Sequence, residues 1–503
     1  MQLIQSALNV GKTALLLVPE ISLTAQTINR IISRFGKDDI AVLHSRLSIG
    51  ERYDEWKKVY EKKAKIIVGT RSAIFAPTRN IGLVIIDEEH DMSYKSESTP
   101  KYDARDIAKY ICKNNNCPLL LGSATPDLKT FYEAKEQEKI EILELTKRAH
   151  NAKLPTVDII DLREELQNGN RTMISTRLYK EIEKNLNDNT QTILFLNRRG
   201  YSTYVICTEC GATVKCKNCN INLTYHHGEN ILKCHYCGYT KKPIINCEEC
   251  GSKNIKYSGT GTQKLEAEIQ KMFPTATTIR MDVDTTTGKD SHEKILERFK
   301  NENINILIGT QMVVKGHHFP NVTLVGVILA DNDLNMEDYR AHERTFQILT
   351  QVAGRAGRGE KEGRVIIQTY NPDNFSIIYS KEQNYEKFYN AEINIRKVLK
   401  YPPFCDIISF SITSTSEEEI ERAVKFIYND TIKVMGKNAI VYKPQPSPID
   451  KIKNTYRWRI ILKCRFGNNI INLVDIVLND FRKNGNKFRH TNFNVDVNSN
   501  NMV

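Results

Sequence analysis

The chain has 503 residues, of which 40% are hydrophobic and 26% are charged, so it can form several domains with ordinary apolar cores. It contains no apolar run of the roughly 20 residues that cross a membrane and no basic and apolar leader, so we expect a cytoplasmic protein that binds no membrane. The formal net charge of +12 suits a polyanionic partner, although a basic excess spread over so long a chain is equally typical of a soluble surface.

A segment near the start of the chain resembles the end of a phosphate-binding loop and runs into the first predicted strand. This segment reads NVGKTALLLVPE, but a P-loop needs its first glycine where Ser6 stands, and it needs a strand before that glycine. The preceding apolar residues fall on one helical face, Gly11 is placed to end that helix, and residues 14–18 form a short apolar run typical of a buried strand. We therefore predict the order helix, turn, strand, and no P-loop at this position.

Alternating strand and helix patterns continue to about residue 131. They predict a doubly wound parallel sheet, and we assign residues 1–140 to a first α/β lobe. Residues 141–175 lack strong periodicity and are predicted to link this lobe to the next. The expected strands lie at residues 14–18, 40–44, 65–69, 83–87 and 118–122.

A second series of strands and helices predicts another α/β lobe at residues 176–205 and 256–371. A cysteine-rich insertion at residues 206–255 interrupts this lobe after its first strand, TILFL. From residue 372 the pattern changes to a long helix-like run, the turn YPPF and alternating segments such as DIISFSIT, so residues 372–503 are predicted to form an α+β domain.

Eight of the twelve cysteines lie in the insertion, as the four pairs CTEC, CKNC, CHYC and CEEC. Such spacing predicts two structural zinc sites with four thiolates each, and an iron–sulfur cluster is the alternative. Glycine or asparagine follows every pair, as a tight left-handed turn requires. The pairs can combine in three ways, and loop length favours a nested arrangement. The predicted outer site consists of Cys207, Cys210, Cys247 and Cys250, and the inner site of Cys216, Cys219, Cys234 and Cys237.

Charged residues follow the strands at places where an α/β cleft would form. In DEEH, Asp87 could hold Mg²⁺ through water while Glu88 orients an attacking water. Such residues are also common as solvated turns, but here GSATP and QVAGRAGRG follow in order. Arg355 and Arg358 in the last motif are suited to stabilise charge on a γ-phosphate, whereas an ordinary surface arginine pair is the alternative.

The motifs VPEISLT, GTRSAIFAP, DEEH, GSATP, GTQMVVKGHHFP and QVAGRAGR resemble, in order and spacing, those of superfamily 2 helicases. The cysteine pairs after NRRGY, together with KYDARDIA, GTGTQKLE, YPPF and PQPSPI, make the chain similar over essentially its whole length to the replication restart helicases of the primosomal protein N′ family. Another superfamily 2 translocase would share DEEH and the arginines but not the four cysteine pairs. A zinc-ribbon binding protein without a motor would share the cysteines alone.

This resemblance implies two RecA-like lobes and an ATP-dependent 3′ to 5′ DNA helicase that recognises stalled or repaired replication forks and restarts replication through primosome assembly. It implies ATP with Mg²⁺ and two structural Zn²⁺ as cofactors. The implied partners are branched DNA forks, single-stranded DNA, the single-stranded DNA-binding protein and other primosome proteins, for a monomer associated with the nucleoid.

The resemblance also implies roles for residues around the cleft. In the segment SYKSESTPKYDARD, Tyr94, Tyr102 and Arg105 are expected to bind DNA and to link it to hydrolysis, for which base stacking on tyrosine is a physical route; an ordinary surface loop is the alternative. The residues expected to contact nucleotide or to couple the lobes are Glu89, His90, Ser123, Thr125, Lys315, Gly316 and Gln351.

The chain departs from the family pattern at its start. In the family a true P-loop and two DNA-binding domains precede a segment like LIQSALNVGKTALLLVPEISLT, so the chain is expected to be N-terminally truncated. Three possibilities remain open for hydrolysis. The chain could be a fragment of an active helicase, a zinc-stabilised DNA-binding and partner-binding module without ATPase activity, or a weak ATPase that uses Lys12.

Overall fold

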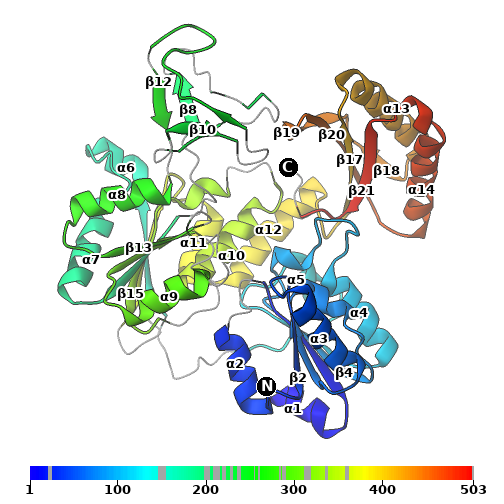
Figure 1. Ribbon diagram of the computed structural model, residues 1–503, viewed down its shortest axis with the longest axis horizontal. Coiled ribbons are helices and arrows are strands. Elements are labelled where there is room, and N and C mark those ends of the chain that lie inside the picture. The colour runs from blue at the N-terminus through cyan, green and yellow to red at the C-terminus, as the bar shows by residue number, and fades with distance from the viewer. Residues whose placement is uncertain are drawn as a thin grey trace.

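The computed structural model comprises two α/β lobes, a small β module and a C-terminal α+β domain (Figure 1). None of the helices within the described ranges combines the length and the apolar character that crossing a bilayer requires. The structure describes residues 1–20, 25–145, 154–196, 204–207, 214, 216–217, 223–226, 230–234, 239–253, 255–258, 261–282, 285, 291–310, 319–334, 338–356 and 362–500.

Lobe 1 has a five-stranded parallel sheet in the order β2-β3-β1-β4-β5, and all five strands were predicted. Apolar clusters cover both faces of the sheet, as in a doubly wound fold. The strands are β1 (Thr13–Leu17), β2 (Ile40–Leu43), β3 (Ile66–Gly69), β4 (Ile81–Asp87) and β5 (Leu119–Gly122). The helices are α1 (Gln2–Asn9), α2 (Ala25–Phe35), α3 (Ile49–Tyr60), α4 (Ala104–Asn115) and α5 (Leu128–Lys135), with short 3-10 turns η1 (Arg71–Phe75) and η2 (Met92–Tyr94).

The start of the chain confirms the predicted order of helix, turn and strand. Helix α1 ends before Gly11, which has a φ of +70°, and β1 follows directly. The aliphatic stem of Lys12 lies so close to Gly82 that an added Cβ there would come within 2.5 Å of it. Gly82 is at the N-terminal end of β4, roughly 16 Å from Asp87 at the other end. The idea that Lys12 serves a phosphate near Asp87 is therefore wrong.

Lobe 2 has a six-stranded parallel sheet in the order β13-β14-β7-β15-β16-β6. Its edge strand, β6 (Thr156–Asp161), pairs along its whole length with β16 and corrects the prediction that residues 141–175 form only a linker. The strand was overlooked because only one face of it is buried. The other strands are β7 (Gln191–Phe195), β13 (Thr278–Met281), β14 (Ile306–Gly309), β15 (Val322–Val327) and β16 (Arg364–Thr369). The helices are α6 (Leu162–Gln167), α7 (Thr176–Asn187), α8 (Thr262–Met272), α9 (Ser291–Asn301) and α10 (Ala341–Ala353), with the 3-10 turn η4 (Ala330–Asn332).

The cysteine-rich insertion forms an antiparallel sheet in the order β11-β10-β9-β8-β12, which projects from lobe 2 (Figure 1). Its strands have only two to four residues each, so the sheet alone buries little apolar surface. They are β8 (Tyr204–Cys207), β9 (Thr224–His226), β10 (Ile231–Lys233), β11 (Thr240–Lys241) and β12 (Ile255–Ser258).

The C-terminal domain packs two helices on an antiparallel sheet in the order β18-β20-β17-β21, with β19 paired to β20. Between lobe 2 and this domain, two further helices carry an aromatic cluster that packs on α5 of lobe 1. These helices are α11 (Phe375–Glu382) and α12 (Tyr385–Leu399). The domain itself consists of β17 (Asp406–Ser414), α13 (Glu417–Met435), β18 (Ala439–Val441), β19 (Gln445–Ile452), β20 (Thr455–Cys464), α14 (Asn468–Lys483), η5 (Gly485–Lys487) and β21 (Thr491–Val497).

Candidate functional site

The acidic turn DEEH lies at the C-terminal edge of the lobe 1 sheet. Asp87 is the last residue of β4, and Glu88 has a φ of 48°, so the chain turns sharply there. The next amide, Glu89 N–H, donates to Gly122 O at 3.0 Å, which joins this turn to the start of GSATP. Asp87 is exposed and Glu88 half-buried, while Glu89 and His90 are buried. The turn therefore keeps Asp87 and part of Glu88 at the surface and directs the side chains of Glu89 and His90 inward.

The Asp87 carboxylate is crowded by protein on one side. This burial raises the pKa of Asp87, and the hydrogen bond from Glu88 N–H, at 3.0 Å from Oδ1, opposes the rise. A divalent cation would favour the ionised form of such a carboxylate. Asp87 and Glu88 thus offer the oxygen ligands that Mg²⁺ prefers, at the sheet edge where ligands of open α/β folds bind.

His90 joins the two lobes through both of its ring nitrogens. Its Nδ1 lies 2.6 Å from Ser123 Oγ in lobe 1, and its Nε2 lies 2.8 Å from Gln351 Nε2 on α10 of lobe 2. The Gln351 amide nitrogen can only donate, so His90 Nε2 accepts and the proton of the neutral ring is on Nδ1, which donates to Ser123. Three separate motifs are therefore connected by two hydrogen bonds across the interlobe cleft.

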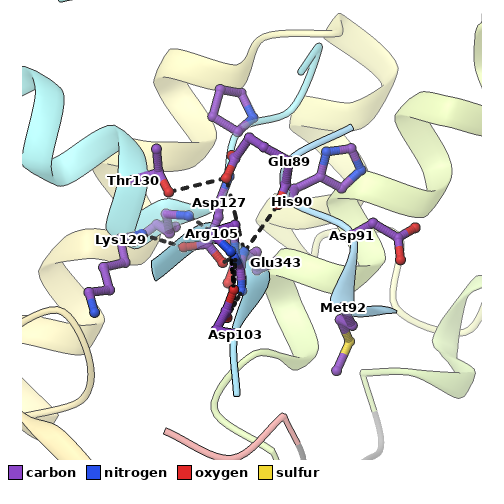
Figure 2. A network of polar contacts seen from close by, with 12 residues as sticks. Glu89, His90, Asp91, Met92, Asp103, Arg105, Asp127, Lys129, Thr130 and Glu343 are labelled. Carbon is purple, nitrogen blue, oxygen red and sulfur yellow. Dashed lines mark hydrogen bonds and ion pairs between the residues drawn. The ribbon is translucent and has the colours of Figure 1, made fainter. Parts of the chain in front are cut away.

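Next to His90, the buried Glu89 belongs to a network of ionic contacts (Figure 2). Arg105 makes a two-pronged contact with Asp103, with Nε–Oδ1 and Nη2–Oδ2 distances of 3.0 and 2.7 Å, and donates from Nη1 to Glu89 O at 3.1 Å. Glu89 accepts hydrogen bonds from Asp127 N–H at 2.6 Å and from Thr130 Oγ1 at 3.2 Å. The carboxylate, with only 1% of its residue exposed, is thus held in place by the first turn of α5.

Neighbouring carboxylates in this network titrate very differently. Burial, reinforced by the negative charge of Asp127, raises the pKa of Glu89 to about 7 despite the nearby Arg105. Burial alone would also raise the pKa of Asp127, but Arg105 and two further arginines lower it to about 2. Asp127 is therefore the permanent negative charge of the network at neutral pH, and Glu89 is the carboxylate that can hold a proton.

The same network extends into lobe 2 through Glu343 on α10. Its Oε1 accepts the Leu128 N–H at the start of α5, at 2.8 Å, and its Oε2 is 2.7 Å from Arg396 Nη2 on α12. A carboxylate at a helix N-terminus is favoured by the helix dipole. Arg396 also contacts Glu392 at 2.9 Å. Both lobes and α12 consequently share one set of buried charges.

The structure describes at least one cysteine of each pair in the insertion. Cys216 and Cys234, from the two inner pairs, are both buried in one small cluster with Leu223 and Leu232. For the outer pairs, the antiparallel register of β8 and β12 places the Cα of Cys207 opposite Ile255.

The CEEC pair itself forms a tight turn. Cys247 N–H donates to Ser252 O at 2.8 Å, Gly251 N–H donates to Cys247 O at 3.0 Å, and Gly251 has the predicted left-handed φ of +72°. A thiolate set is the donor chemistry of structural zinc, so these residues fit the metal. Among the described residues, however, no group of three metal-binding side chains is assembled.

Four family models match different parts of the chain. Residues 1–134 match the DEAD/DEAH box helicase family, and residues 244–360 match the helicase conserved C-terminal domain. Residues 216–242 match the Cys-rich region (CRR) domain of the PriA DNA helicase, and residues 397–499 match the primosomal protein N C-terminal domain. The two lobes are therefore RecA-like helicase lobes, and the insertion is a PriA zinc ribbon.

The replication restart protein PriA of Treponema pallidum is 38% identical over 461 residues, which are 92% of this chain and 69% of that protein. The Rickettsia felis protein of the same name is 38% identical over 465 residues, 92% of this chain and 70% of that protein. The chain belongs to the PriA family of replication restart proteins. The PriA protein of Bacillus subtilis is 44% identical over 501 residues, 99% of this chain, and the chain spans 62% of that relative's length.

The structure corrects one of the predicted DNA contacts. Tyr94 is fully buried, and its hydroxyl donates to the backbone oxygens of Asp87 and Leu17 at 2.6 and 3.2 Å. No base can stack on a ring without exposed surface, so Tyr94 supports the acidic turn from below. Arg105 is half-buried, and its guanidinium is held by Asp103 and by Glu89 O. Tyr102 is also half-buried, so both residues keep some exposed surface and their DNA contacts stay predictions.

The other predicted residues are placed as follows. Thr125 is buried, and its N–H donates to Ser123 Oγ at 3.0 Å, which stabilises the GSATP turn beside His90. Arg355 is half-buried at the end of α10, one turn beyond Gln351. Predicted residues that lie outside the described ranges are Lys315, Gly316, Arg358, Cys210, Cys219 and Cys237.

Sequence reasoning missed the residues that join the lobes below His90. Asp127 directly follows GSATP and could have been recognised as the N-cap of α5. Glu343 and Arg396 gave no comparable signal, because they are 53 positions apart and their contact exists only in the folded chain.

Proposed function

We propose that this chain carries the motor and C-terminal parts of an ATP-dependent 3′ to 5′ DNA helicase that recognises stalled or repaired replication forks and restarts replication through primosome assembly. The observation that carries the proposal is the pair of hydrogen bonds from His90 to Ser123 and Gln351, beside Asp87 and Glu88. A motor must transmit the state of its nucleotide site to the second lobe, and His90 contacts both lobes next to the two exposed carboxylates.

In this proposal Asp87 and Glu88 hold Mg²⁺ and orient water, and bound ATP supplies the energy for movement. Arg355 from lobe 2, with Arg358, stabilises the charge that develops on the γ-phosphate. Ser123 and Thr125 link the nucleotide site to the lobe interface. Lys315 and Gly316 of lobe 2 lie where the nucleotide and DNA contacts meet. Glu89 and His90 bind no nucleotide directly, because both are buried.

The proposed DNA contact on lobe 1 includes Tyr102. Its ring packs edge to face with that of Phe75, with centroids 4.8 Å apart, and Phe75 is 57% exposed. The guanidinium of Arg71 lies 5.7 Å from the Tyr102 ring centroid and donates to the backbone oxygens of Ser93 and Lys95. An exposed aromatic pair beside a cation is a surface on which unpaired bases can stack.

The zinc ribbon is proposed to hold two structural Zn²⁺ in the nested arrangement and to present surface to primosome proteins. Closed thiolate sites leave no open coordination position, so the ribbon has no hydrolytic role. The proposed partners are forked and single-stranded DNA, the single-stranded DNA-binding protein and other primosome proteins.

The proposal is tested by DNA-stimulated ATP hydrolysis. The chain as written is assayed with single-stranded DNA, next to Glu88→Gln in the same chain and next to the longer Bacillus subtilis PriA. Hydrolysis by the chain that Glu88→Gln abolishes supports a motor with the proposed carboxylate role. Hydrolysis that persists at the same rate in Glu88→Gln contradicts that role.

A second candidate function is a zinc-stabilised module that binds DNA and partners without hydrolysing ATP. This candidate is favoured by the position of Lys12. Its side chain packs on Gly82 near the N-terminal end of β4, whereas Asp87 is at the C-terminal end of the same strand. This candidate predicts that only the longer relative hydrolyses ATP, while the chain as written still binds forked DNA.

A further inference from the structure

The last described residues of the chain leave the C-terminal domain and contact both helicase lobes. Residues 496–500, here named the C-terminal strap, begin at the end of β21, on the side of the C-terminal domain that faces lobe 1 (Figure 1). Asp496 and Asn500 are 7% and 6% exposed, so the two ends of the strap are buried. Burial of polar side chains at the end of a chain requires partners, and these come from two other domains.

In lobe 1 the strap binds the segment that follows the acidic turn. Asp496 Oδ2 lies 2.8 Å from Lys101 Nζ, and Asp496 Oδ1 lies 3.4 Å from Lys95 Nζ. Lys95 Nζ also donates to Val497 O at 2.7 Å. Lys95 is itself buried, and the strap supplies the carboxylate of Asp496 and the carbonyl of Val497 to its ammonium group.

At its other end the strap joins lobe 1 to lobe 2. Asn500 Nδ2 donates to Met92 O of lobe 1 at 2.8 Å. Two arginines of lobe 2 contact the same residue: Arg344 Nη2 donates to Asn500 O at 2.5 Å, and Arg340 Nη1 donates to Asn500 Oδ1 at 3.4 Å. One asparagine therefore bridges the two lobes.

The strap holds the same two elements that His90 and Gln351 connect. Met92 is two residues after His90, and Arg344 is on α10, two turns or roughly 10 Å before Gln351. A single contact between two bodies allows rotation about it in any direction, whereas two separated contacts restrict rotation to the axis that joins them. We propose that Asp496 and Asn500 are positioning residues, through which the C-terminal domain sets the orientation of the two helicase lobes at the Glu88–His90 turn.

That the strap matters for a motor rests on the proposed function, whereas the contacts of the strap with both lobes do not depend on it. If the C-terminal domain binds DNA or a partner and moves, the strap transmits that movement to the turn that carries Asp87 and Glu88. Its loss leaves the buried Lys95 without the Asp496 carboxylate, so the turn Met92–Tyr94 is expected to open locally more often.

Hydrogen exchange measured by mass spectrometry tests the link in the full chain, without nucleotide. In the double variant Asp496→Ala/Asn500→Ala, the amides of Tyr94 and Lys95, which donate to Asp91 O and Met92 O, should exchange about tenfold faster. Amides in the central strand β17 should keep their rates. Unchanged exchange at Tyr94 and Lys95 would overturn the proposal, and so would an equal increase in β17, because it would indicate general loss of the C-terminal domain.

Two further variants separate a specific contact from simple packing. Asp496→Glu keeps the carboxylate and should restore most of the protection, whereas Asp496→Asn should not. Asn494→Ala is the matched control, since Asn494 is exposed and lies two residues earlier on the same face of β21. If Asn494→Ala accelerates exchange at Tyr94 as strongly as Asn500→Ala, the strap has no special role.

The orientation itself is measured by energy transfer between two dyes attached to non-natural residues at exposed positions, Lys113 on α4 and Lys300 on α9. The strap variant should show a broader distribution of interlobe distances than the parent chain and Asn494→Ala. An unchanged distribution would contradict the positioning role. Because neither measurement involves ATP, failure of the ATPase assay and failure of this proposal can be told apart.

Discussion

Between the lobes, the buried Glu89 lies against the half-buried Arg105 and Asp127, and their charges are balanced by contacts from two lobes and α12. The zinc ribbon has no comparable set of partners among its described residues, and its small buried cluster includes Cys216 and Cys234. The interlobe site is thus stabilised by many protein contacts of moderate energy, whereas the ribbon, in our proposal, depends on a few bonds to metal. The two regions should therefore respond differently to chemical perturbation.

The largest expected effect is that of metal removal on the ribbon. Structural zinc sites contribute on the order of 10 kcal/mol to the folding of the module that they hold. Chelation should unfold the ribbon while the lobes keep their cooperative transition, because both lobe cores lie outside it. Circular dichroism and hydrogen exchange with and without chelator measure this difference.

The number of zinc ions bound per chain, measured in single cysteine variants beside a control variant, tests the two proposed sites. Cys216→Ser and Cys247→Ser should each lower bound zinc from two ions to one per chain, as the nested pairing requires. Cys117→Ser, at a half-buried thiol of lobe 1, should leave two. Loss of both ions in either single variant would contradict two independent sites.

The next effect is expected at Arg396. It is 3% exposed and contacts both Glu343 and Glu392, so Arg396→Ala leaves two carboxylates buried without their cation. Removal of one partner from a buried ionic set costs about 3–5 kcal/mol. Urea denaturation should show this loss in the free energy of unfolding. Arg298→Ala, in an exposed pair with Glu302, should cost less than about 1 kcal/mol.

Glu89 should make the stability of the interlobe site depend on pH. Its pKa is raised to about 7, so its stabilising contribution is complete below its usual pKa near 4.5 and is lost as the pH rises through 7. Between pH 5 and pH 8 the free energy of unfolding should fall by roughly 2 kcal/mol through this group. Asp127, with a pKa of about 2, adds no change in that window. Glu89→Gln should remove most of the slope; an identical slope in the variant would refute the assignment.

The smallest effect is expected at the contact between His90 and Gln351. Gln351→Ala removes one hydrogen bond across the cleft and should cost about 1 kcal/mol. The nitrogen chemical shifts of the His90 ring should report the neutral tautomer with its proton on Nδ1. Gln351→Glu places an acceptor opposite Nε2 and should convert the ring to the imidazolium form. Absence of that conversion would mean that Gln351 does not set the protonation of His90.

Much of the fold follows from local sequence. Each strand of the lobe 1 sheet is a short apolar run bounded by turn residues, so the five strands could be located without tertiary information. β6 could not, because it is an edge strand with one exposed face and its partner β16 lies about 200 residues later. The four cysteine pairs could be recognised from their spacing alone, whereas which pairs share a metal stays a prediction.

Some features of the candidate site likewise follow from local sequence, and others arise only in the folded chain. The sequence by itself determined which residues stand at the sheet edge, since Asp87 ends an apolar strand, and that Gly11 to Thr13 is a turn between helix and strand. Only the tertiary structure decided that Tyr94 is a buried support, that Arg105 is paired with Asp103, and that Glu343 and the C-terminal strap join the lobes. The physical reason is that burial and charge compensation are set by groups distant in the chain, whereas strand and turn preferences are set by neighbouring residues.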